Sequence, residues 1–86
     1  MIKITLKQVN KRVHLEAKIN NNEWFVGFSI RLGIVLKEMK DTHVQLLSQS
    51  ITNNSSHYVI HHTDTSTLID VLNKQFNPDI LKITVL

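Results

Sequence analysis

The sequence predicts an α+β domain in which two helices pack on one face of a mostly antiparallel sheet, in the order β-β-β-α-β-β-α-β. Apolar and polar residues alternate along residues 2–30, a period of two that is typical of half-buried strands. The apolar period then changes to helical spacing, and a hairpin followed by a second helix occurs later in the chain. With 86 residues, the chain is expected to form a single domain (1–86) with one modest core.

Two short loops are predicted to fold residues 2–30 into a three-stranded meander. The loops are Asn10-Lys11 and Asn21-Asn22, and Asn tolerates the left-handed backbone that such turns need. One face of the meander then collects the alternating apolar residues Ile2, Ile4, Leu6, Val13, Leu15, Ala17, Ile19, Trp24, Val26, Phe28 and Ile30. A slip of one residue would scatter this set over both faces, so the pattern fixes the register, with Ile19 between Ile2 and Trp24.

The opposite face of the meander is basic. We predict a binding site there, formed by Lys3, Lys7, Arg12, His14, Lys18 and Phe25. In the predicted register Lys3 lies opposite Lys18, a mildly destabilising pair of like charges, and Phe25 lies beside Lys18. A cationic strip with one aromatic ring is typical of surfaces that bind phosphates and stack bases. The alternative is a solvated face whose lysines keep the sheet soluble and discourage edge pairing.

The middle of the chain contains a helix and a second hairpin. Helical spacing of apolar residues predicts a short helix from about Leu32 to Asp41, although residues 33–36 also fit a buried strand. Val44–Ile51 and His57–Thr63 then form a hairpin around a polar loop. Its poorer alternation predicts a more exposed hairpin, on which Tyr58 is either an anchor for a partner or a partly buried packing residue.

The last third of the chain is predicted to form a helix and a strand. Residues 64–67 offer several N-cap candidates, and Asn77-Pro78-Asp79 ends the helix. The buried stripe of this helix comprises Leu68, Ile69, Val71, Leu72 and Phe76. The strand Ile80–Leu86 is apolar on both faces, which indicates that it is covered on both sides or pairs with a second subunit in a homodimer.

Composition excludes several kinds of chemistry. The chain has no Cys, which excludes disulfides, thiolate catalysis and Cys-ligated zinc, and its two Gly are too few for a nucleotide-cradling loop. A nucleophile elbow and paired carboxylates are also missing from the sequence. We therefore expect no enzymatic activity and no cofactor. Because no apolar run resembles a signal peptide or a membrane span, we expect a cytoplasmic protein without a membrane partner.

The five histidines suggest two chemical alternatives. His57 and His61 share a strand face while His62 points away, but a metal site needs further ligands and Asp64 is the only acid nearby, so no metal site is predicted. A small basic nuclease centred on His14 would need a second general acid or base, and none is placed convincingly. Polar histidines on an exposed hairpin are the simpler interpretation.

The distribution of charge completes the functional hypothesis. Residues 1–40 hold eight Lys or Arg against three acids, whereas residues 41–86 hold two against four. We predict a non-catalytic binding module whose basic face contacts nucleic acid, a nucleoprotein or an acidic protein surface. The alternative is a protein-protein inhibitor or adaptor, such as a phage or mobile-element accessory protein that acts on a host protein.

Overall fold

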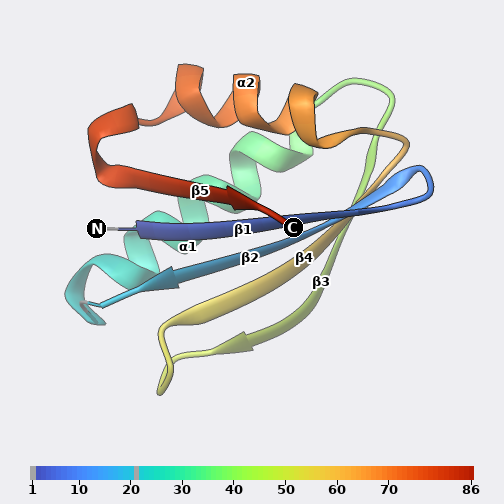
Figure 1. The fold of residues 1–86 in the computed structure, drawn as a ribbon. Helices are drawn as coiled ribbons and strands as arrows, with labels where there is room; N and C mark the ends of the chain where they lie inside the picture. Colours follow the sequence, from blue (N-terminus) through green and yellow to red (C-terminus); the bar gives the residue numbers. More distant parts are fainter. Residues whose placement is uncertain (1, 21) are drawn as a thin grey trace.

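The structure is a computed structural model that describes residues 2–20 and 22–86. The elements are β1 (Ile2–Val9), β2 (Arg12–Ile19), α1 (Asn22–Lys37), β3 (His43–Ser50), β4 (Ser55–His61), α2 (Thr65–Gln75), the 3-10 turn η1 (Pro78–Ile80) and β5 (Leu81–Val85). The strands form one five-stranded sheet in the order β3-β4-β2-β1-β5, and both helices lie on the same side of it (Figure 1). All strand pairs are antiparallel except β1 and β5, which are parallel. The predicted α+β class with a mostly antiparallel sheet is confirmed.

The first hairpin has the predicted register. Asn10 takes a left-handed conformation (φ 58°) in the two-residue turn, as its side chain permits. Ile2 faces Ile19 across β1 and β2, and Lys3 faces Lys18. The alternating apolar residues of both strands are buried, so the first two strands of the predicted meander are confirmed.

The third strand of the predicted meander is wrong. Residues 24–30 belong to α1, which runs to Lys37 and also includes most of the short helix that was predicted to start at Leu32. Of the predicted second loop, Asn21 lies outside the described residues, and Asn22 begins α1. The second neighbour of β2 in the sheet is β4, which takes the place that the sequence pattern gave to residues 24–30.

The spacing of the buried residues explains why this segment is helical. Phe25, Phe28, Leu32 and Leu36 are buried at intervals of three, four and four residues, which is one face of a helix. The outer face of α1 is also apolar, and its residues supplied the apparent period of two. A helix with two apolar faces therefore resembled a strand in the sequence.

One hydrophobic core lies between the sheet and the two helices. Its buried members are Ile2, Ile4, Leu6, Val13, Leu15, Ala17, Ile19, Phe25, Phe28, Leu32, Leu36, Tyr58, Ile60, Leu68 and Leu72. Tyr58 belongs to this core, and its burial raises the pKa of the phenol, so it is a packing residue. Within the described chain, no helix has both the length and the apolar character needed to cross a membrane.

The second hairpin is confirmed with shifted ends and with one correction. β3 and β4 pair as predicted, with a bulge between Leu46 and Ser48. The edge strand β3 is mostly exposed, as expected. β4 lies between β2 and β3 and buries Tyr58, Val59 and Ile60, so the expected exposure is wrong for this strand.

The start and end of α2 follow the predicted chemistry. Asp64 is the N-cap, and its carboxylate accepts a hydrogen bond from the Thr67 backbone N–H at 2.8 Å. The helix ends at Gln75, and Pro78 begins the short turn before β5. The hydrogen bonds from the backbone and side chain of Thr67 hold the pKa of Asp64 below its ordinary value of 3.8.

Replacing Asp64 by Ala is expected to lower the melting temperature by a few degrees at neutral pH, because α2 loses its cap. A depressed pKa in the folded state stabilises the fold above the unfolded-state pKa, and this contribution is lost as the pH falls through the folded-state value. The difference between wild type and Asp64→Ala should therefore shrink in acid, below the ordinary pKa of 3.8. Asp64→Asn, which can still cap the helix, is the control and should remove only the pH dependence. A difference that stayed constant from neutral pH into acid would contradict this role of the carboxylate.

Candidate functional site

The face of the sheet turned away from the helices carries five of the six residues predicted to form the binding site. Because side chains alternate along a strand, Lys3, Lys7, Arg12, His14 and Lys18 point away from the core residues that lie between them. We call this surface the open face. Phe25 does not belong to it: this ring lies on α1 and is only 1% exposed, in the core. The predicted stacking role of Phe25 is therefore wrong.

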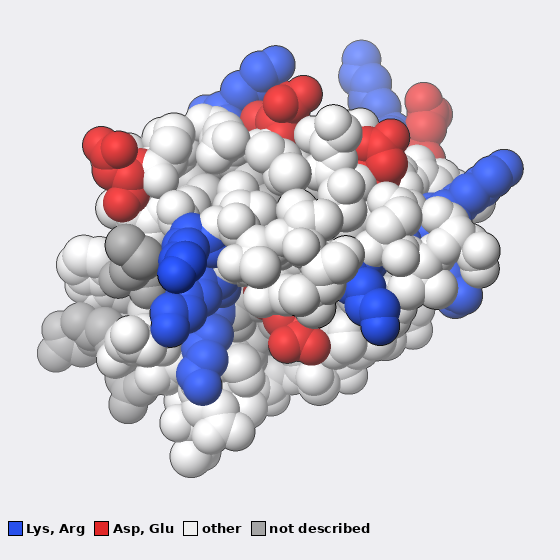
Figure 2. All heavy atoms as spheres, viewed as in Figure 1, with Lys and Arg blue, Asp and Glu red and all other residues white. Residues whose placement is uncertain are grey.

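Three lysines form a row across the open face. Lys3 of β1 faces Lys18 of β2 on one side and Lys82 of β5 on the other. Neighbouring strands are about 4.8 Å apart, so the row places three lysines at adjacent positions on three strands. Figure 2 shows Lys and Arg side chains gathered over the starts of β1 and β5. Sequence reasoning missed Lys82, because nothing in its surroundings indicates a parallel pairing with β1.

Two adjoining hollows mark the open face. The first, of about 330 Å³, is lined by Lys3 and Lys18 together with hydroxyl-bearing residues such as Ser48 and Ser55. The second, of about 290 Å³, is lined by Lys7 and His14 among others. Both hollows share Thr5, Glu16 and His57. Ammonium, hydroxyl and imidazole groups thus surround both depressions, and all three can donate hydrogen bonds to an anion.

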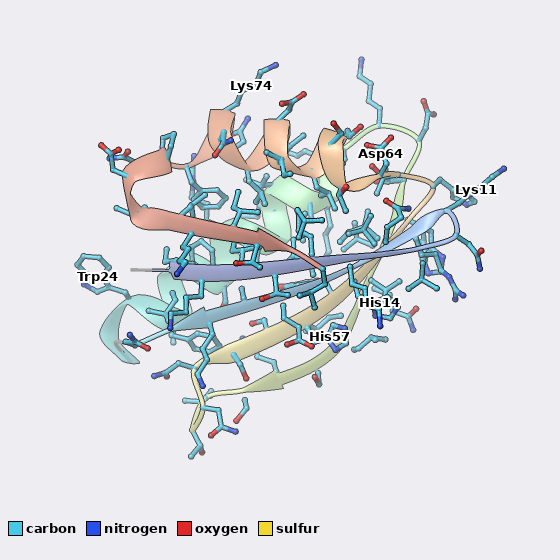
Figure 3. The ribbon with its side chains drawn as sticks, viewed as in Figure 1. Lys11, His14, Trp24, His57, Asp64 and Lys74 are labelled. Carbon is cyan, nitrogen blue, oxygen red and sulfur yellow. The ribbon has the colours of Figure 1, made fainter. Side chains whose placement is uncertain are left out.

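Histidines from different strands pair on the same face. The Nδ1 atom of His14 lies 3.1 Å from the Nε2 atom of His57, with the ring centroids 5.3 Å apart. Figure 3 shows the two rings side by side, on the side of the sheet away from the helices. One ring donates its N–H to the other, so at least one of the two is neutral in this arrangement.

His43 and His61 form the second imidazole pair, with ring centroids 5.6 Å apart. The pKa of His61 is lowered, first because its ring is shielded from water and then because His43 and Arg12 lie beside it. Among the residues that the structure describes, no group of three or more potential ligands could hold a metal ion. The side chains of the open face therefore offer hydrogen-bond donors and positive charge, with Glu16 as the carboxylate between the two hollows.

A second surface lies on the outer side of α1. Val26, Ile30 and Ile34 are 53%, 60% and 52% exposed at four-residue spacing, and we call them the α1 stripe. A groove of about 510 Å³ runs between the stripe and β3, where Gln49 and Ile51 line it. The sequence pattern had placed Val26 and Ile30 in the core, so this surface was missed.

Trp24 also differs from its predicted position. The predicted meander places it opposite Ile19, with a role either in the core or in an interface. It is instead 60% exposed near the start of α1 and projects away from the body of the protein (Figure 3), so a role in the core is wrong. Its ring adds to the exposed apolar area of the helix. Exposed apolar surface of this extent is typical of an interaction site.

The chain matches no protein-family model, and no curated protein matches its sequence.

Proposed function

We propose that this protein is a non-catalytic binding module that holds the phosphates of nucleic acid on the open face of its sheet. The observation that carries the proposal is the row formed by Lys82, Lys3 and Lys18 on three adjacent strands. Like charges at neighbouring positions of a sheet destabilise it. A polyanion removes this repulsion, and the counterions that it releases on binding add to the affinity.

The polar groups around the lysines support the same ligand class. Hydroxyl and imidazole groups line the two hollows, and such groups commonly donate hydrogen bonds to phosphate oxygens. Phe25, the ring that would have stacked on a base, is buried in the core. The proposed contact is therefore with the phosphate backbone, and it should depend little on base sequence.

A salt titration tests the proposal. Fluorescence anisotropy with two unrelated DNA duplexes should give similar affinities, and the logarithm of the binding constant should fall linearly with the logarithm of the salt concentration. If the three lysines of the row each neutralise one phosphate, the slope should be roughly −2 to −3. A binding constant that does not change with salt, or no binding at low salt, would overturn the proposal.

An acidic protein surface is the alternative partner for the open face. The two possibilities separate in a pull-down with tagged protein before and after nuclease treatment. If the ligand is nucleic acid, the material captured by the tagged protein should disappear after nuclease treatment. A single protein that is retained in stoichiometric amount would replace our proposal with that of an adaptor or inhibitor.

A further inference from the structure

The outer face of α1 is unusual because it is apolar although it faces solvent. The opposite face of the helix already packs into the core through Phe25, Leu32 and Leu36. An apolar helix face is normally buried against a neighbour. The α1 stripe, more than half exposed at each of its three residues, therefore indicates a contact that the single chain does not make.

The sequence of the stripe is symmetric about Ile30. Gly27 and Gly33 stand three residues before and after it, and Val26 and Ile34 stand four residues before and after it. These two glycines are the only ones in the chain. A Cβ atom built on Gly33, in the groove beside the stripe, would lie 3.5 Å from the Tyr58 hydroxyl, which is an ordinary contact. A Cβ atom built on Gly27 would meet nothing within 4 Å, so this position is open space on the outside of the helix. Glycine weakens a helix, and a position like this suits close approach by another backbone.

We propose that α1 is the interface of a two-fold symmetric homodimer in which the two α1 helices pack antiparallel and cross at Ile30. With a rise of about 1.5 Å per residue, Ile34 of one copy then lies nearly level with Gly27 of the second copy. Val26 lies nearly level with Gly33 of the second copy in the same way. Each aliphatic side chain thus meets a position without a side chain, and the contact is self-complementary, as a two-fold interface requires.

The self-complementary sequence of the α1 stripe and the exposed apolar residues around it favour a second copy over an unrelated partner. A stable interface buries about 800 Å² on each partner. The α1 stripe is extended toward this area by the neighbouring groove, by Trp24, and by Ile51, which is 69% exposed.

Cysteine crosslinking tests the geometry directly, because the chain contains no Cys of its own. Ile30→Cys alone should form a disulfide-linked dimer under mild oxidation, since the two copies of this residue meet at the crossing point. A mixture of Gly27→Cys and Ile34→Cys should give the mixed dimer in excess over either self-crosslinked species. Leu86→Cys, at an exposed position on the C-terminal side of β5, is the control and should remain monomeric on a denaturing gel. Failure of Ile30→Cys to crosslink, or efficient crosslinking through Leu86→Cys, would overturn the proposal.

Sedimentation equilibrium gives the second test. The wild type should dimerise, and Ile30→Asp should raise the dimer dissociation constant by about 100-fold, because two carboxylates would meet in an apolar contact. Gly27→Leu should also favour the monomer while preserving the helical circular dichroism, since a larger residue improves helix propensity but fills the space for Ile34. Leu86→Asp, with the same change of charge outside the stripe, should leave dimerisation unchanged. A wild type that stays monomeric at high concentration, or an Ile30→Asp variant that still dimerises, would contradict the interface.

The dimer and the nucleic-acid proposal can fail independently. The α1 stripe lies on the helix side of the sheet, and the lysine row lies on the other side. Monomeric Ile30→Asp should therefore keep the slope of DNA binding against salt. A variant with a reversed lysine row should in turn remain a dimer.

Discussion

Phe25→Ala is expected to lower the free energy of unfolding by about 3–5 kcal/mol, which is the usual loss for a buried Phe. The ring is 1% exposed and packs from α1 into the core of the domain. Urea denaturation followed by circular dichroism measures the change, and the midpoint should fall while the slope of the transition stays the same. This loss is a large part of the stability expected for a domain of this size.

The neighbouring aromatic residue provides a matched control for Phe25. Trp24 is 60% exposed, so Trp24→Ala should change the unfolding free energy by only about 0.5 kcal/mol when measured at a protein concentration that favours the monomer. If this segment were a strand, Trp24 would be buried and Phe25 would lie on the basic face. The larger loss of unfolding free energy would then come from Trp24→Ala. Weak DNA binding by Phe25→Ala without loss of stability would therefore contradict the helical assignment.

Reversing two lysines of the row should have the largest effect on binding. Lys3→Glu/Lys18→Glu is expected to weaken DNA binding by roughly 100-fold near 0.1 M salt and to reduce the salt slope by about 2. The reason is that two phosphate contacts are lost and two carboxylates then repel the backbone. Anisotropy titrations at several salt concentrations measure both quantities.

Two further variants separate local charge from net charge. Lys40→Glu/Lys74→Glu changes the net charge by the same amount outside the open face, and Lys74 lies on α2 (Figure 3), so binding should weaken far less. Glu16→Gln removes the carboxylate between the two hollows and should strengthen binding several-fold. Equal losses from the two double variants would indicate attraction by net charge alone and would argue against a binding site on the open face.

The first hairpin could be predicted because its signals are local and agree with one another. The alternation of β1 and β2 and the turn at Asn10 point to the same register, and any slip would expose Leu6 or Leu15. The same reasoning placed Lys3 opposite Lys18 correctly. Five residues of the open face were found in this way.

The helix α1 was missed because a helix is recognised in a sequence by one apolar face and one polar face. Its core face and its outer face are both apolar, so every second residue between Trp24 and Ile30 is apolar by coincidence. The helical signal was nevertheless present in the spacing of Phe25, Phe28 and Leu32. If the α1 stripe contacts a second copy, the misleading residues are those that serve the interface.

Lys82 could not be predicted because the pairing of β1 with β5 is non-local and parallel. Neither strand carries a turn signal that joins it to the other, and six elements lie between them in the chain: β2, α1, β3, β4, α2 and η1. The placement of β5 depends on how the helices cover the core. A prediction made from each segment separately contains no information on how the helices cover the core.

The parallel pairing of β1 and β5 also sets an order of assembly. β1 can join β2 as soon as the first turn closes, but its other edge has no partner until the ribosome has released residues 81–85. Non-local strand pairing is slow, since a long segment of chain must first be confined. During synthesis the growing polypeptide therefore carries β1 as an open edge strand, and lysines on an edge strand, here Lys3 and Lys7, discourage its pairing with another chain until β5 is added.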